Sequence, residues 1–243
     1  MSRMRADQLL VARGLAESRA RAQAAIEAGG VTADGSPVTK AAQMLGEDAV
    51  LTLEAPHPWV SRAGVKLDAA LTAFGVSVEG CACLDVGAST GGFTQVLLAR
   101  GAARVAAVDV GREQLHRILR EDARVTAMEG VDARTLTAEM LGFAPTRIVC
   151  DASFIGLEKV LPVPLSLAAP DAVLIALVKP QYEIGPGRGG ALLQHAAARL
   201  TAERVVRDLD GLHGFVVKSM IDSDIRGGDG APEFVMLAEK RGP

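Results

Sequence analysis

Long apolar runs are missing from this 243-residue sequence, although about half of its residues are hydrophobic. No run approaches the roughly 18–20 residues that a helix needs to span a bilayer. Residues 1–5 include two arginines, but no apolar segment follows them, so they are not typical of a secretory signal. We therefore expect a cytoplasmic protein without membrane contact.

Cysteine and histidine are also scarce, with three and four residues. Cys81, Cys83 and Cys150 lie in or beside apolar runs that are predicted to be strands, which favours core thiols over disulfides. The Cys-x-Cys spacing is too short for a usual zinc half-site, and the histidines are dispersed. We expect no metal site.

An excess of positive charge is absent, because 26 Lys and Arg residues face 29 Asp and Glu residues, for a net charge of −3. This balance argues against a protein that holds nucleic acid by overall charge, although a local basic surface is compatible with it. Residues 1–30 contain five arginines, whose forked guanidinium groups suit phosphate. Arg19 and Arg21 fall in the first turn of a predicted helix, where positive charge opposes the helix dipole. A phosphate partner is one interpretation, and a solvated helix face is the other.

Residues 1–54 are predicted to form a small α+β domain. We expect helices over 5–13 and 19–28, a short hairpin over 31–38 and a strand over 50–53. This order resembles the S4 RNA-binding module through Arg5-Ala6-Asp7-Gln8-Leu9-Leu10, Arg13-Gly14-Leu15, Ser18-Arg19, Ala22, Ile26, Gly30-Val31 and Asp34-Gly35. In that family the second helix and the loop after it lie on structured RNA. The resemblance therefore implies RNA contacts from Arg5, Arg13, Ser18, Arg19 and Arg21.

Residues 55–60 are predicted to link this domain to the remainder of the chain, 61–243. Pro56 and Pro58 favour an extended, semi-rigid stretch. Trp59, the only tryptophan, is expected to pack at the domain junction, with base stacking as the alternative.

Strands and helices alternate from residue 82 onward, after a helix predicted over 62–74, and this alternation predicts a doubly wound α/β sheet of seven strands. We expect strands at 82–86, 104–108, 125–128, 147–150, 173–178, 215–220 and 234–238, and helices at 91–100, 112–120, 135–141, 156–168 and 190–210. The last two strands are joined through Asp229-Gly230 without a helix, so the final strand should run antiparallel. This Rossmann-like arrangement resembles the fold of the S-adenosylmethionine-dependent methyltransferases.

A glycine turn follows the first strand of this sheet, in Leu84-Asp85-Val86-Gly87-Ala88-Ser89-Thr90-Gly91-Gly92-Phe93. The glycines allow a sharp bend and close approach of a ligand, and the N–H groups at the start of the next helix would face that ligand. The spacing is neither Gly-x-Gly-x-x-Gly nor a P-loop. By itself the turn indicates a nucleotide-like ligand only weakly, and a structural turn is a serious alternative.

Ionisable residues follow five successive strands, at the sheet edge where ligands bind in open α/β folds. They are Asp85, Asp109, Asp132, Asp151 and Lys179. An acid about 20 residues after a glycine turn, as at Asp109, accepts ribose hydroxyls. Asp132 is placed to reach an adenine amino group, and Asp85 to face the amino group of a methionine moiety. Helix capping is the alternative for each acid taken alone.

Lys179 ends a six-residue apolar strand, where a buried charge is costly unless it is paired. Asp151, at the end of the neighbouring strand, can pair with it. For Lys179 to act as a base, its pKa must fall toward ~7–8, which a neighbouring carboxylate opposes. A purely structural ion pair between Lys179 and Asp151 is therefore an alternative to a catalytic role.

The chain as a whole resembles the TlyA (hemolysin A) family, in which an S4 module precedes an FtsJ-like 2'-O-ribose methyltransferase domain. The motifs are Val60-Ser61-Arg62-Ala63-Gly64-Val65-Lys66-Leu67, the glycine turn through Thr94, Val108-Asp109-Val110-Gly111, Gln114-Leu115-His116, Asp151-Ala152-Ser153-Phe154-Ile155, Ala176-Leu177-Val178-Lys179-Pro180-Gln181 and Glu233-Phe234. The resemblance implies a catalytic set of Lys66, Asp151, Lys179 and Glu233. In that set Lys179 accepts the 2'-hydroxyl proton, Asp151 orients it, and the other two position the hydroxyl. The resemblance implies S-adenosylmethionine as cofactor, held by Asp85, Gly87, Ser89, Thr90, Gly91, Gly92, Phe93, Asp109, Val110 and Asp132, with a methionine carboxylate at residues 89–92.

Three segments depart from that family. Gly111-Arg112-Glu113-Gln114 replaces the usual Gly-Tyr-Gly-Gln, Asp132 replaces an Asn, and Ala191-Leu192-Leu193-Gln194 replaces Val-Val-Arg-Asp. The main expectation is methylation of a ribose, in a cytidine, within ribosomal RNA or ribosomal subunits. An RNA-binding factor without catalysis and a membrane-active hemolysin are the alternatives, and a dehydrogenase fits the glycine spacing poorly.

Overall fold

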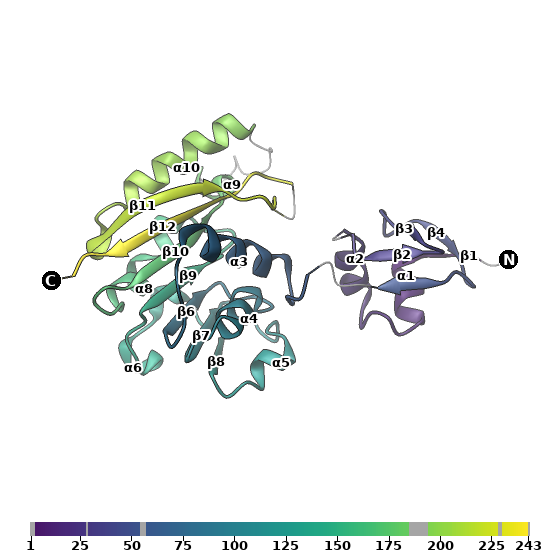
Figure 1. Ribbon diagram of the computed structural model, residues 1–243, viewed down its shortest axis with the longest axis horizontal. Coiled ribbons are helices and arrows are strands. Elements are labelled where there is room, and N and C mark those ends of the chain that lie inside the picture. Colours follow the sequence, from purple (N-terminus) through teal and green to yellow (C-terminus); the bar gives the residue numbers. More distant parts are fainter. Residues whose placement is uncertain (1–2, 28, 54–56, 185–193, 228–229, 243) are drawn as a thin grey trace. The chain divides into compact units, whose positions relative to one another are not determined.

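The computed structural model describes residues 3–27, 29–53, 57–184, 194–227 and 230–242 (Figure 1). The chain divides into two compact units, residues 1–58 and 59–243. The expected linker, 55–60, straddles this division, and its residues 55 and 56 lie outside the described residues. Trp59 and Val60 pack against the core of the second unit, where the side chain of Trp59 covers Gly64.

The first unit is a small α+β structure. Its elements are β1 (Arg3–Arg5), α1 (Ala6–Ala12), α2 (Arg19–Glu27), β2 (Val31–Ala33), β3 (Ser36–Pro37), β4 (Met44–Gly46) and β5 (Leu51–Leu53). β1 pairs with β4, while β3, β2 and β5 form a second antiparallel sheet. Leu9, Leu10 and Ile26 from the two helices pack on Val31 in a common core. The sequence did not predict β1 and β4, because three-residue strands with mixed polarity carry no clear alternation.

The second unit contains a seven-stranded sheet in the order β11-β12-β10-β9-β6-β7-β8. Its strands are β6 (Ala82–Val86), β7 (Arg104–Asp109), β8 (Val125–Glu129), β9 (Arg147–Cys150), β10 (Val173–Val178), β11 (Phe215–Asp222) and β12 (Phe234–Lys240). Neighbours from β8 to β10 run parallel, and β12 lies antiparallel between β10 and β11. The α/β fold class and the antiparallel final strand are thus confirmed.

Helices cover both faces of this sheet. They are α3 (Arg62–Phe74), α4 (Gly92–Ala99), α5 (Arg117–Arg120), α6 (Ala138–Leu141), α7 (Leu157–Val160), α8 (Pro162–Ser166), α9 (Pro180–Glu183) and α10 (His195–Leu209), with 3₁₀ turns η1 (Ala133–Thr135) and η2 (Leu212–Gly214). Residues of α3 and α4 share one core with Cys83, while residues of α7, α8 and α10 share the other with Leu84. Alternate residues of β6 therefore point to opposite layers.

Three predicted helices are shorter or broken, each for a local reason. The helix expected over 112–120 begins only at Arg117, because the Glu129 carboxylate accepts the N–H groups of Gln114 and Leu115 at 2.6 and 3.0 Å. Pro162 starts a new helix within the one expected over 156–168. The helix expected over 135–141 is interrupted at Leu136, whose backbone is extended. The start of the helix expected over 190–210, and most of the departure at 191–194, lie outside the described residues.

Candidate active site

A cavity of about 480 Å³ opens at the carboxyl ends of β6, β7 and β9. Its walls include Gly87 from the glycine turn, Asp109 and Val110 after β7, and Asp132 before η1. Val110 is an exposed apolar side chain at this wall, with 71% of its surface accessible. The size and the mixed apolar and acidic lining suit a nucleoside.

Asp109 is fixed by backbone donors at the end of β7. Its two carboxylate oxygens accept the N–H groups of Ser89 at 2.8 Å and Gly111 at 2.7 Å. The Ser89 N–H group is thus committed to Asp109, although it belongs to the turn that is predicted to hold a methionine carboxylate. A carboxylate held this firmly on a cavity wall can still accept further hydroxyl groups through its remaining lone pairs.

Asp132 lines the same cavity but has a partner of its own. Its oxygens accept hydrogen bonds from the Arg134 side chain, the shortest at 2.5 Å, and from the Arg134 backbone N–H group at 2.9 Å. These bonds hold the pKa of Asp132 below its usual range. Its adenine contact stays a prediction, and the structure adds the helix-capping role that was the alternative.

The glycines of the turn are required by protein packing. A Cβ atom at Gly87 would lie 2.8 Å from the Ala152 Cα atom, and one at Gly92 would lie 2.9 Å from the Gly64 backbone nitrogen. The space beside Gly91 is filled by Leu115 and Leu119. Of the three, only Gly87 lines the cavity, so close approach of a ligand does not account for Gly91 and Gly92.

A second, more polar cavity of about 250 Å³ adjoins the first, since both are lined by Gly87, Ser89, Asp151 and Ser153. Its remaining walls come from the start of α3, including Arg62 and Lys66, and from Thr90 and Phe93. Two cationic side chains thus face a space that is continuous with the nucleoside-sized cavity.

Lys179 and Asp151 form the ion pair that the sequence predicts at neighbouring strand ends. The Lys179 Nζ atom lies 2.7 Å from the Asp151 Oδ1 atom, and it donates to the Asp151 backbone carbonyl at 2.9 Å. It also donates to the Ser153 hydroxyl at 2.8 Å, whereas its contact with the Asp151 Oδ1 atom is an ion pair without hydrogen-bond geometry. Burial alone would lower the pKa of Lys179, but the carboxylates of Asp151 and Glu233 outweigh it and hold the pKa above its ordinary value.

Lys66 and Glu233 form a second buried ion pair. The Lys66 Nζ atom lies 2.5 Å from the Glu233 Oε2 atom, and the two side chains are only 9% and 3% exposed. Lys66 comes from the second turn of α3, and Glu233 directly precedes β12. Because Glu233 also acts on Lys179, the four residues form one electrostatic group of alternating charge.

Asp85 is fully buried behind these cavities and lines neither of them. Its Oδ2 atom accepts a hydrogen bond from the Thr94 hydroxyl at 2.7 Å, while its Oδ1 atom is buried without a hydrogen-bond partner among the described residues. Burial, with smaller contributions from the charges of Asp151 and Asp109, raises the pKa of Asp85 to about 7, although the hydrogen bonds from Thr94 oppose this rise. A free acceptor oxygen here fits a cationic donor, and the methionine contact of Asp85 stays a prediction.

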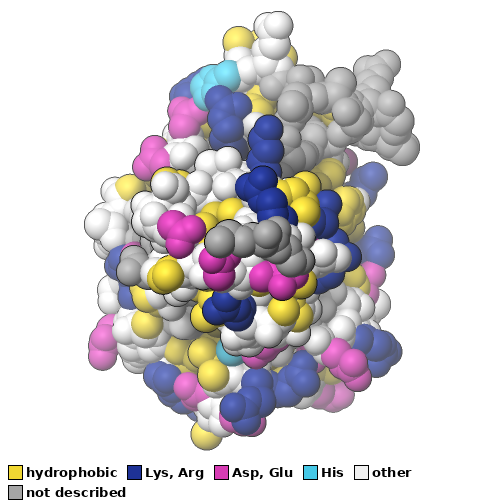
Figure 2. Space-filling model, turned by 90° about the vertical axis from the view of Figure 1, so that its right-hand side faces the viewer, with side chains coloured by type: hydrophobic (Ala, Val, Ile, Leu, Met, Phe, Trp, Pro, Cys, Tyr) yellow, Lys and Arg dark blue, Asp and Glu magenta, His cyan; other side chains and the backbone are white. Residues whose placement is uncertain are grey.

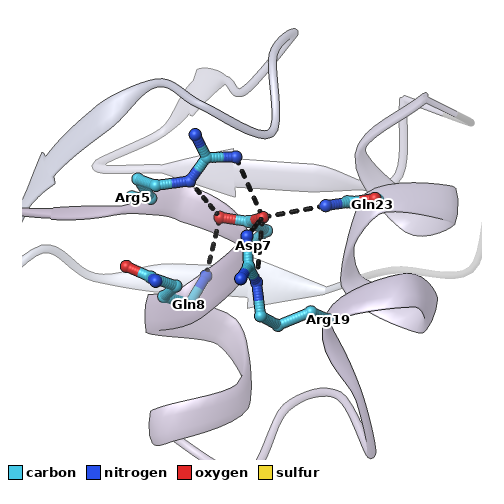
Figure 3. A network of polar contacts seen from close by, with 5 residues as sticks. All are labelled: Arg5, Asp7, Gln8, Arg19 and Gln23. Carbon is cyan, nitrogen blue, oxygen red and sulfur yellow. Dashed lines mark hydrogen bonds and ion pairs between the residues drawn. The ribbon is translucent and has the colours of Figure 1, made fainter.

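The predicted RNA-binding residues of the first unit have different surroundings. Arg5 and Arg19 both bind the buried carboxylate of Asp7, a contact that the sequence did not predict (Figure 3). Arg13 donates to the Glu47 backbone carbonyl. The Ser18 hydroxyl accepts the Arg21 N–H group at 3.3 Å, as expected for an N-cap.

Ser153 and Phe154 are two site residues to which the sequence assigned no role. Ser153 contacts Lys179 between the two cavities. Phe154 is 87% exposed on the larger cavity, its backbone has a left-handed φ of +66°, and its ring lies 5.1 Å from that of Tyr182. An exposed aromatic in a strained conformation is typical of a functional position. A single sequence gives no signal for either feature.

Within the described parts of the chain, no group of three metal-ligating side chains comes together. The helices described there include none of the length and apolar character needed to cross a membrane. Figure 2 shows acidic side chains among the basic ones on the face drawn, in line with the small net charge.

Comparison with known proteins places this geometry in a family. Residues 59–240 match the FtsJ-like methyltransferases, and residues 4–51 match the S4 domain. The 16S/23S rRNA (cytidine-2'-O)-methyltransferase TlyA of Mycobacterium tuberculosis is 49% identical over 190 residues, which cover 77% of this chain and 71% of that protein. A solved protein of Streptococcus thermophilus that carries a hemolysin name has a TM-score of 0.76 at 36% identity, covering 99% of this chain and 90% of that one.

A more distant structure shows the fold alone. It comes from Listeria monocytogenes and is described as an S-adenosylmethionine dependent methyltransferase, with a TM-score of 0.55 at 14% identity, and it covers 74% of this chain and 99% of its own. With these matches over both units, the chain belongs to the FtsJ-like methyltransferase family and carries an S4 domain before its methyltransferase domain.

Proposed function

We propose that this protein transfers a methyl group from S-adenosylmethionine to the 2'-hydroxyl of a ribose in ribosomal RNA, and that the ribose belongs to a cytidine. The observation that carries the proposal is the pairing of Lys179 with Asp151 and of Lys66 with Glu233 beside a nucleoside-sized cavity. The activity named for the Mycobacterium tuberculosis relative is the same reaction.

The residues of the larger cavity fit the cofactor. Asp109 offers a rigid carboxylate to ribose hydroxyls, and Val110 offers an apolar surface to a base. Asp85 lies buried behind this cavity, and its unpartnered Oδ1 atom fits an ammonium donor. When bound, S-adenosylmethionine supplies a methyl group on a sulfonium centre that needs no further activation.

The protein's own contribution is alignment and proton transfer. In the proposed reaction Lys179 receives the proton of the 2'-hydroxyl, Asp151 holds Lys179 in place, and Lys66 with Glu233 positions the hydroxyl. Because the pKa of Lys179 is raised, it carries its proton at neutral pH in the free protein. Only the small neutral fraction can accept a proton, so the reaction should speed up as the pH rises.

The S4 domain supplies the proposed contact with ribosomal RNA or ribosomal subunits, through Arg5, Arg13, Ser18, Arg19 and Arg21. An RNA-binding factor without catalysis would share this contact. A membrane-active protein, as the hemolysin name suggests, would instead lyse erythrocytes equally well with Lys179 replaced.

The test is methyl transfer from labelled S-adenosylmethionine to ribosomal subunits that lack the modification. We expect the unaltered chain to label the RNA and Lys179→Ala to lose that activity. The matched control is Lys218→Ala. Lys218 lies on the edge strand β11, is half exposed, and pairs with Glu239 of β12 at 3.5 Å. Equal labelling by Lys179→Ala and the control would contradict the proposed role, and no labelling by the unaltered chain would favour the non-catalytic factor.

A further inference from the structure

One carboxylate in the first unit holds two arginine side chains from different elements (Figure 3). Asp7, in α1, is completely buried. It accepts hydrogen bonds from Arg5 at 3.0 and 3.1 Å, from Arg19 at 2.9 and 3.3 Å, from the Gln23 side chain at 2.9 Å and from the Gln8 N–H group at 3.0 Å. We propose that Asp7 is a positioning residue, which fixes the guanidinium groups of Arg5 and Arg19 as a phosphate-binding pair on RNA.

The geometry leaves one edge of each guanidinium group available. Arg5 and Arg19 both use their Nε and Nη2 atoms for Asp7, and a planar guanidinium group carries its Nη1 donors on another edge. The carboxylate is 0% exposed, whereas the Arg5 and Arg19 side chains are 38% and 53% exposed. The negative charge thus lies inside, while both arginine side chains reach the surface.

The charge balance points the same way. Two guanidinium groups surround one carboxylate, so the cluster keeps one net positive charge. The hydrogen bond from Arg5 is the main cause that lowers the pKa of Asp7 below its usual range, so the carboxylate stays ionised at neutral pH. Satisfying a buried carboxylate does not require a second arginine, and Arg19 stands at the start of α2, where its charge opposes the helix dipole. Asp7 offsets only one of the two guanidinium charges, so a further anionic partner, such as an RNA phosphate, suits the charge that remains.

A simple charge model and the positioning model predict opposite changes in RNA affinity for the substitution Asp7→Asn. Asp7→Asn removes a negative charge from an RNA-binding unit, so on charge alone it should tighten binding. If Asp7 positions the two guanidinium groups, the same substitution should weaken binding, because an amide holds each fork by at most one oxygen. Glu17→Gln is the matched control, since Glu17 is exposed in the same unit and its replacement makes the same change in charge.

The experiment measures binding of the full chain to deproteinised 23S ribosomal RNA as a function of salt. The inference rests on the proposed RNA partner. We expect Asp7→Asn to bind about tenfold more weakly, and its log–log salt slope to be shallower by about 1.5, as for two lost phosphate contacts. Glu17→Gln should bind as tightly as the unaltered chain or more tightly.

A second variant guards against a folding defect in Asp7→Asn. Arg5→Lys with Arg19→Lys keeps both charges but loses the forks, and it should also weaken binding. Unchanged affinity and salt slope in Asp7→Asn, or in the double lysine variant, would overturn the positioning role alone. Absence of binding by the unaltered chain would overturn the proposed function together with it.

Discussion

Replacement of Asp85 by Asn should stabilise the methyltransferase unit, and by more at high pH than at low pH. Asp85 is fully buried, and its pKa is about 7 instead of the 3.8 of an exposed carboxyl group. As the pH rises above about 4, the unfolded chain releases this proton while the folded chain keeps it. The free energy of unfolding therefore falls with rising pH until the folded carboxyl group also ionises, near pH 7.

The magnitude follows from the two pKa values. Each pH unit between them is worth about 1.4 kcal/mol, so the raised pKa of Asp85 lowers the free energy of unfolding, relative to its value below pH 4, by about 4 kcal/mol at pH 8 and by about 2 kcal/mol at pH 5.5. Asparagine keeps the shape and can still accept the hydrogen bond from Thr94. The advantage of Asp85→Asn should thus grow by about 2 kcal/mol between these pH values.

Denaturant unfolding of both proteins at pH 5.5 and pH 8, followed by the signal of Trp59 in the second unit, measures this difference. All other titrating groups are common to the two proteins and cancel in the comparison. A stability difference that is the same at both pH values would refute the reasoning, since it would mean that Asp85 does not titrate between them. If Asp85 also holds the cofactor, the stabilised variant should bind S-adenosylmethionine more weakly.

Three further predictions concern the site. Lys66→Met should destabilise the second unit by about 3–5 kcal/mol in denaturant unfolding, because it leaves the Glu233 carboxylate buried without its partner. Adding Glu233→Leu should recover most of that stability but no methyltransferase activity. A Lys66→Met variant as stable as the unaltered chain would contradict this prediction. Gly92→Ala should cost about 1–3 kcal/mol in the same assay, since the new Cβ atom meets the Ser61 hydroxyl at the start of α3; an unchanged melting temperature would count against close packing of α3 on α4. The value of kcat/KM should rise about tenfold per pH unit from pH 6.5 to 9 if neutral Lys179 is the proton acceptor, and a plateau beginning near pH 7 would point to another acceptor.

The centre of the sheet could be predicted from the sequence because its buried strands are short apolar runs. Residues 173–178 are six apolar residues in succession, as a strand covered on both faces requires, and β10 has the expected bounds. The same logic placed Asp151 and Lys179 at neighbouring strand ends, where parallel pairing of β9 and β10 brings them together. The parallel pairing of neighbouring strands thus places residues that follow each strand in the sequence side by side in the site.

Features that depend on tertiary contacts could not be predicted from the sequence. Asp7 reads as an ordinary helix residue, and only the packing of α1 against α2 brings Arg19 to it. The turn after β7 was predicted as helix, yet the Glu129 carboxylate of β8 accepts its N–H groups, and Glu113 adopts a left-handed φ of +57°. Phe154 became noticeable only through its exposure and backbone conformation.

The most direct test of the account is the identity of the modified nucleoside. Ribosomal RNA treated with the protein and S-adenosylmethionine can be digested to nucleosides and analysed by mass spectrometry. We predict 2'-O-methylcytidine as the new product, formed by the unaltered chain and by Lys218→Ala but lost in Lys179→Ala. A methyl group on a base, or a 2'-O-methyl group formed equally well without Lys179, would contradict it.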